Sequence, residues 1–320
     1  MNPPAPFLGE VLHQLHLASL CLPNPIPRPK FIDLGVGLLC GQGPKTLTSA
    51  LEWLEQDQQD WSADYRLFSQ TQWLVEDLFA PLFAQAVADP TVASAPRVYT
   101  GTDDTLLRKT GKKIPGTTYA RDPLSPPFQV NLVLGQRFVQ TSLLIQPAGS
   151  EHPWRALPVS FSPAPTPKIP KRGSEEQQTA VKEFRKKHRL SVIALEQLHV
   201  CRRQLDLQPG GAQKWLIDAY LARWEVEVNF RDEKTLLGVG QAQVRSPQSV
   251  ARAPAFLVAC YALLLWSNIR VFGDHRTDSF KKLPRWRNAE PVRPSTRDLL
   301  RLLQQQAQDY QPRQAPIIPN

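Results

Sequence analysis

The chain has 320 residues, and its 38 Lys and Arg residues against 29 Asp and Glu residues give a formal net charge of +9. This length is ample for one large domain or two smaller ones, each with its own hydrophobic core. The excess of basic residues favours a polyanionic partner such as nucleic acid, because Lys and Arg displace the counterions condensed on it. Two clusters of basic residues strengthen this expectation, and they consist of Arg108, Lys109, Lys112, Lys113 and Arg121, and of Lys182, Arg185, Lys186, Lys187 and Arg189.

The four cysteines show no spacing typical of metal ligands, and we expect them to be free thiols in a reducing cytosol. The opening MNPPAPFLGE lacks the basic start and the apolar run of a signal peptide. The most apolar segment, Pro254–Ile269, has about 16 residues, fewer than the roughly 20 that span a bilayer. We therefore expect a buried core helix, no membrane partner and a cytoplasmic location.

The N-terminal part of the chain is predicted to be helical. The first 35 residues are rich in proline, and they allow a short helix at Phe7–Leu20. A longer helical region is expected from Lys45 to about Val87, where large apolar residues recur at helical spacing.

After Pro96 the pattern changes to strands. Arg97–Asp103 is predicted to be a short strand that ends at Asp103, with Gly101 and Asp103 on the same side. Arg137–Ile145 alternates well, and Leu157–Ser162 is its expected partner. The stretch from Pro163 to Pro170 is rich in proline and should be extended.

Helices return in the second half of the chain. Ser174 and Gln177 form a capping-box pattern before a basic helix, and Leu190–Leu205 has helical periodicity up to a Pro-Gly-Gly stop. Leu216–Lys234 is predicted to be the next helix. In the basic C-terminal part we expect a helix at Ser295–Gln308, followed by a disordered end.

Four polar residues of the Leu216–Lys234 helix share one face. Tyr220, Arg223, Glu227 and Lys234 fall within roughly 60° of one another at 3.6 residues per turn. An adjoining apolar stripe should pack this helix on a core, and it consists of Ala219, Ala222, Val226, Phe230 and Leu237. Any one of the four polar residues could simply belong to a solvent-exposed helix face. Four such residues at this fixed spacing are less easily explained in that way.

The spacing Tyr-x2-Arg-x3-Glu-x6-Lys resembles the signature helix of the DDE-class insertion-sequence transposases named for those four residues. The runs VNFRDEKTLLGVGQAQVR and GTDDTLLRKTGKKIPG also resemble that family, and the resemblance extends from about Thr46 to Gly273. It implies an α/β (α+β) RNase H-like fold, in which Tyr220, Arg223 and Lys234 contact the double-stranded DNA of transposon ends. It also implies that Asp103 and Glu227 are the first and last of three catalytic carboxylates, which bind metal, and that Asp104 points elsewhere.

The chemistry of such enzymes is phosphoryl transfer assisted by two Mg²⁺ ions about 4 Å apart, which carboxylate oxygens hold. The second Asp should lie on a strand beside the Asp103 strand, and no residue of this chain fits. Asp122 precedes a proline, Asp206 ends a helix, and Asp218 lies roughly 160–180° around the helix from Glu227. An internal deletion between Lys214 and Trp215 is the simplest explanation.

The sequence therefore predicts three regions: an N-terminal helical DNA-binding region at 1–95, an incomplete RNase H-like core at 96–273, and a basic, partly disordered tail at 274–320. We interpret the chain as a transposase-derived DNA-binding protein that has lost catalysis, with Mg²⁺ as its cofactor only if it is active. Two alternatives stay open: an active transposase, in which an unrecognised second Asp or a complete partner chain completes the site, and a non-catalytic regulator that binds transposon ends. The resemblance also allows a homodimer, and it implies a bacterial protein associated with the nucleoid.

Overall fold

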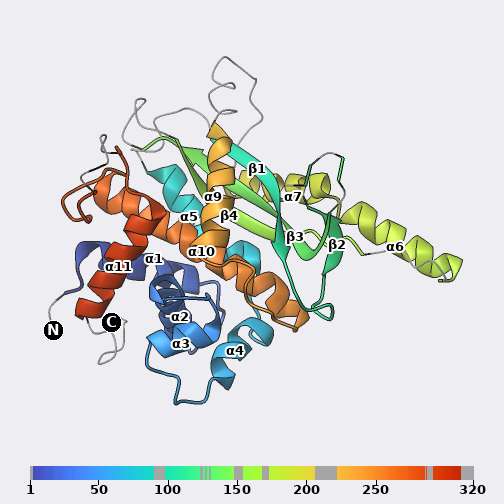
Figure 1. Cartoon of the computed structure of the whole chain (residues 1–320), viewed down its shortest axis with the longest axis horizontal. Coiled ribbons are helices and arrows are strands. Elements are labelled where there is room, and N and C mark those ends of the chain that lie inside the picture. Colours follow the sequence, from blue (N-terminus) through green and yellow to red (C-terminus); the bar gives the residue numbers. More distant parts are fainter. Residues whose placement is uncertain are drawn as a thin grey trace.

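The computed structural model describes residues 3–89, 98–122, 125–126, 128–129, 131–147, 154–167, 173–205, 222–284, 286 and 291–310. Helices surround one antiparallel sheet, and one helix projects from the body (Figure 1). The helices are α1 (Pro6–Ser19), α2 (Arg28–Cys40), α3 (Leu47–Trp53), α4 (Ser62–Ser69), α5 (Val75–Ala88), α6 (Glu175–Lys187), α7 (Leu190–Leu205), α9 (Trp224–Thr235), α10 (Pro247–Phe272) and α11 (Thr296–Tyr310). The strands are β1 (Tyr99–Arg108), β2 (Thr118–Arg121), β3 (Leu132–Ile145) and β4 (Arg155–Pro163).

The long strand β3 organises the sheet. It pairs antiparallel with β1 along one side and with β2 and β4, one after the other, along its second side. In the described part of the chain β1 pairs with β3 alone, so β1 is an edge strand there. The result is a mixed α/β fold with a mostly antiparallel sheet, which agrees with the predicted fold class and is consistent with a DDE or RNase H-like domain.

The positions of the predicted strands were correct, but the strands were predicted too short. β1 continues to Arg108, so Asp103 lies in the middle of the strand and not at its end. The run TDDT contains the polar residues that ended the predicted strand, but regular pairing with β3 continues through it. The predicted pairing of Leu157–Ser162 with Arg137–Ile145 is confirmed by β3 and β4.

The helix α10 forms the centre of the hydrophobic core. It is longer than predicted, because Ser246 caps it and Pro247 takes its first position, where a missing N–H costs nothing. It is long and apolar enough to cross a membrane, yet 83% of its most apolar 18-residue stretch is buried inside the protein. Such burial is expected of a core helix.

The N-terminal helices and α11 pack on α10, so one apolar cluster extends from Phe7 to Ala307. The sequence missed α2, because Pro27 and Pro29 resemble a proline-rich loop. Proline is nevertheless compatible with the first turn of a helix, and α2 begins beside both. The predicted helix at Leu190–Leu205 and the Ser174–Gln177 capping box are confirmed. The three region boundaries stay a prediction.

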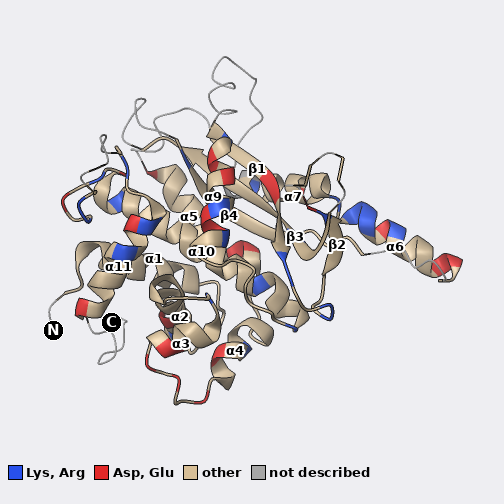
Figure 2. Cartoon of the chain, viewed as in Figure 1, with Lys and Arg blue, Asp and Glu red and all other residues tan. Residues whose placement is uncertain are grey.

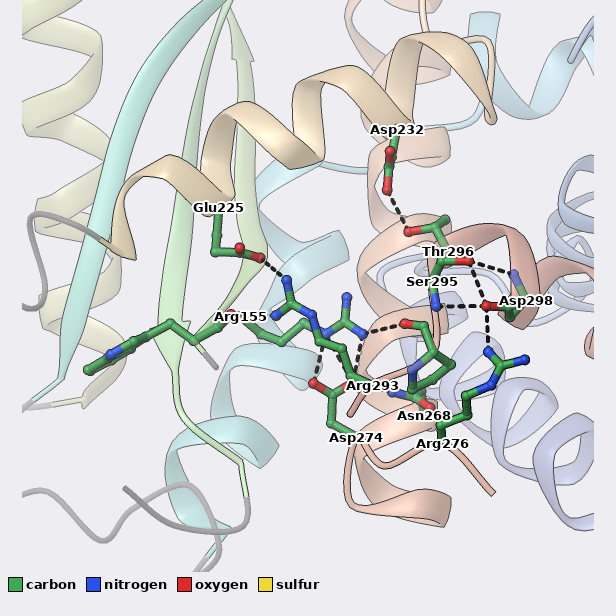
Figure 3. A network of polar contacts seen from close by, with 12 residues as sticks. Arg155, Glu225, Asp232, Asn268, Asp274, Arg276, Arg293, Ser295, Thr296 and Asp298 are labelled. Atoms are coloured by element: carbon green, nitrogen blue, oxygen red, sulfur yellow. Dashed lines mark hydrogen bonds and ion pairs between the residues drawn. The ribbon is translucent and has the colours of Figure 1, made fainter. Parts of the chain in front are cut away.

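A buried polar network joins β4 to the end of α10 and to the segment before α11 (Figure 3). Arg155 Nη2 donates to Asp274 Oδ1 at 2.7 Å and to the Pro294 carbonyl at 3.0 Å. Asn268 Nδ2 donates to the same Asp274 oxygen at 2.6 Å. The side chains of the ion pair are 7% and 0% exposed. The predicted basic tail is thus partly structural, since Arg293 also binds Glu225 of α9 at 2.8 Å.

Candidate nucleic-acid and metal site

The carboxylate of Asp103 lies on the face of β1 that α9 covers. Gly101 is on the same face, and a Cβ there would lie 3.1 Å from Val226 Cγ2 of α9. The absence of a side chain at Gly101 therefore allows the helix to approach the strand closely. Asp104 has the opposite orientation, because side chains alternate along a strand, and it pairs with Arg137 at 3.2 Å.

The apolar stripe predicted for the helix packs α9 on the sheet. Val226 and Ala222 are buried against Leu144 of β3 and Ala156 of β4, and Phe230 packs beside them. Leu237, beyond the end of α9, is also buried, whereas Ala219 lies outside the described residues. The packing turns the face that carries Glu227 toward Asp103 and solvent.

Arg223 joins the two predicted catalytic carboxylates. Its Nη1 donates to Asp103 Oδ2 at 2.8 Å, and its Nη2 donates to Glu227 Oε1 at 3.3 Å. The side chains of Arg223, Asp103 and Glu227 are 37%, 34% and 38% exposed. The fold therefore brings Asp103 together with Arg223 and Glu227, which lie more than a hundred residues further along the chain.

Lys234 lies near the C-terminal end of α9. Lys234 is an exposed residue, and its Nζ is 5.9 Å from the centroid of the Phe230 ring. Loss of water around the ammonium lowers the pKa of Lys234, and the Arg108 charge lowers it further. Tyr220, the fourth residue of the predicted face, lies outside the described residues.

A second catalytic Asp is not found in the described part of the chain. Asp122 is buried and forms an ion pair with Arg108 at 2.7 Å. Asp206 and Asp218 lie outside the described residues. Among the residues that are described, no group of three or more His, Cys, Asp and Glu side chains could hold a metal ion.

Asp103 and Glu227 would be the residues to hold one divalent cation, and they would not suffice for the two-ion arrangement. One guanidinium contacts both carboxylates, so it is a stand-in for a cation that the pair could share. Mg²⁺ is commonly bound by one or two carboxylates and completes its shell with water. A second ion would need further ligands, which the described residues do not offer here.

Part of the predicted basic surface is not available to DNA. Lys109 is buried, and its ammonium donates to the carbonyls of Gly240 and Ala242, both at 2.7 Å. Burial lowers the pKa of Lys109 to about 8. Lys112 and Lys113 are exposed, as are the basic residues of the second predicted cluster, which are Lys182, Arg185, Lys186, Lys187 and Arg189. Most of that second cluster is on the projecting helix α6 (Figure 2).

The sequence reasoning missed Glu233 in α9. This residue is 1% exposed, and burial raises the pKa of its carboxyl to about 8, so it is mainly protonated at neutral pH. The side chain of Gln140, opposite Asp103 in the β1–β3 pairing, lowers this pKa, but by less than burial raises it. Glu233 follows Val226 by two helical turns, so an extension of the apolar stripe along the helix would have placed it on the buried side.

Comparison with known proteins identifies the family. Residues 34–209, more than half of the chain, match the family described as DDE superfamily endonuclease. The matched region includes Asp103 and ends before Glu227, so the role of Glu227 rests on the resemblance of its helix. Neither a curated protein nor a solved structure matches the chain. The chain belongs to the DDE superfamily endonuclease family and is transposase-like.

Proposed function

We propose that this chain is a transposase-derived protein that binds the DNA ends of an insertion sequence and does not cleave them by itself. Membership of the family implies transposase-like DNA cleavage by descent, and endonucleases of this family typically use divalent metal ions. The observation that carries the proposal is the bridge from Arg223 to Asp103 and Glu227, which no third acidic ligand joins in the described part of the chain.

The proposed fold of the catalytic region is RNase H-like and incomplete. β1 carries Asp103 and forms an edge of the sheet in the part of the chain that the structure describes. In the family that the Tyr-Arg-Glu-Lys helix resembles, this edge pairs with the strand that bears the second Asp. A deletion between Lys214 and Trp215 accounts for the loss of both the strand and the ligand.

Strand cleavage is expected to be absent in the purified chain. Two-metal catalysis needs carboxylates that surround both ions, and Asp103 and Glu227 supply ligands for only one ion. The measurement incubates the chain with end-sequence DNA and Mg²⁺ or Mn²⁺ and looks for nicked or joined strands. Metal-dependent product that Asp103→Asn and Glu227→Gln both remove would contradict this prediction, and Asp206 would then be the first residue to test as the additional ligand.

DNA binding is expected to depend steeply on salt and on α6. Each phosphate contact contributes about −0.9 to the slope of log affinity against log salt. The double variant Lys186→Ala/Lys187→Ala should lower this slope by roughly one to two, because both residues are exposed on α6. Arg297→Ala/Arg301→Ala removes the same charge from α11 and is the matched control. Equal slopes for the wild-type chain and the α6 variant would exclude α6 from the interface.

Lys234→Ala is expected to weaken the binding of end DNA by about 1–3 kcal/mol while leaving the fold intact. Lys234 is an exposed residue whose side chain can reach a phosphate, and it is on the same helix as Arg223. Arg231→Ala is the control on that helix, because it removes an exposed charge that pairs with Asp232. Titration of duplex DNA measures both variants, and equal affinities would show that Lys234 is a solvated residue without a DNA role.

A further inference from the structure

We propose that Arg223 gates a divalent-cation site at Asp103 and Glu227, and that DNA opens the gate. In the DNA-free chain the guanidinium neutralises both carboxylates. When a DNA phosphate attracts Arg223, the carboxylates are freed and a divalent cation can bind between them. This inference rests on the proposed DNA binding and adds to it a coupling between the two ligands.

The charges at the site favour this exchange. Two carboxylates and one guanidinium leave a net charge of −1, so a divalent cation that approaches while Arg223 is in place meets a positive group at contact distance. A guanidinium binds a phosphate with the same forked geometry that it uses for a carboxylate. With more than a third of its side chain exposed, Arg223 is accessible to a phosphate from solvent.

Each of the two carboxylates is positioned by backbone structure that does not depend on the Arg223 side chain. Asp103 is in the middle of β1, and its Oδ1 accepts a hydrogen bond from the Asp104 N–H at 2.8 Å. Glu227 follows Val226, which is fully buried against the sheet. Arg223 is at the N-cap of α9, where its long side chain can leave by rotation of its own torsions, without unwinding the helix. The site therefore persists when the gate opens.

Thermodynamic linkage requires the coupling to be reciprocal. If DNA raises the affinity for the cation, the cation raises the affinity for DNA by the same factor. Removing Arg223 should replace this behaviour with a site that is always open. The cation would then bind well without DNA, and DNA would add nothing to its affinity.

The first arm of the test measures Mn²⁺ binding to the DNA-free chain by electron paramagnetic resonance. Arg223→Ala should bind Mn²⁺ about tenfold more tightly than the wild-type chain or better, since a positive charge at contact distance is removed. Arg223→Gln, a near-isosteric neutral variant, should show the same gain, and melting curves check that both variants fold. Arg231→Ala removes a charge from the same helix without touching either carboxylate and should show no such gain. The gain should disappear when Asp103→Asn is added.

The second arm repeats the titration with a short random-sequence duplex, after subtraction of Mn²⁺ bound by the duplex alone. The wild-type chain should gain Mn²⁺ affinity and Arg223→Ala should not. Three outcomes overturn the gate alone: no gain in Arg223→Ala without DNA, a gain that survives Asp103→Asn, or an equal DNA effect in both proteins. Failure of the wild-type chain to bind the duplex at low salt overturns the proposed function, and the gate with it.

Discussion

Replacing Arg155 with alanine is expected to lower the free energy of unfolding by about 3–5 kcal/mol, because the change leaves the Asp274 carboxylate buried without its charged partner. Both side chains are almost fully buried, and the guanidinium contacts both oxygens of Asp274, with Arg155 Nε 2.9 Å from Oδ2. The variant also removes the bond to the Pro294 carbonyl, which holds the segment before α11. Urea denaturation followed by circular dichroism measures the change.

An exposed ion pair provides the control for this prediction. Arg270 is 48% exposed and lies 3.4 Å from Asp89 and 3.6 Å from Glu10. Arg270→Ala should cost less than about 1 kcal/mol, because solvent screens exposed pairs. The double variant Arg155→Met/Asp274→Asn should recover part of the loss, since it removes both charges. Similar costs for Arg155→Ala and Arg270→Ala would show that the buried network does not stabilise the fold.

Replacing Glu233 with glutamine is expected to stabilise the protein at pH 8 and above and to have almost no effect near pH 4. The folded-state pKa of about 8 exceeds the ordinary value of 4.5, chiefly because of burial. As pH rises between these values, the unfolded chain ionises Glu233 and the folded chain does not, so the wild-type protein loses stability across this window. The difference at high pH is on the order of 4 kcal/mol.

The measurement compares denaturation free energies of Glu233→Gln and the wild-type chain at a series of pH values. Other acids, such as the half-buried Asp33, whose pKa burial raises to about 6, titrate in both proteins and cancel in the difference. Glu183→Gln on the exposed surface of α6 is the matched control and should leave the pH profile unchanged. Parallel profiles for the wild-type chain and Glu233→Gln would mean that the carboxyl is ionised in the folded protein.

Local patterns in the sequence predicted the parts of the site that depend on local geometry. The spacing from Arg223 to Glu227 fixes their position on one helical face, and the structure places the two side chains in contact. The buried stripe of α9 and the capping of α6 could be predicted for the same reason. Contacts between distant segments could not be predicted, because periodicity contains no information about which strand a helix will cover. The ion pair from Arg223 to Asp103 is of this kind.

The same limit explains the errors. The prolines at the start of α2 were interpreted as a loop, although the first turn of a helix accepts proline. The two Asp residues inside β1 oppose a regular strand locally, and tertiary contacts outweigh that preference. Pairing with β3 keeps β1 extended through Asp103 and Asp104, and the apolar face of α2 packs into the main core. Lys109 appeared in a cluster of basic residues, yet the loop that buries it comes from residues 240–242.

The exposed helix α6 has a thermodynamic consequence for any ligand that it contacts. None of its residues is buried, so its helical form depends on its capping box and on basic residues in its last turn. Isolated helices of about this length are only marginally stable in water. In solution α6 should exchange between helix and coil, and a polyanion bound along it would shift that equilibrium toward the helix. Its apparent affinity would then include the free energy of ordering the α6 backbone, and an increase in helical circular dichroism should accompany binding.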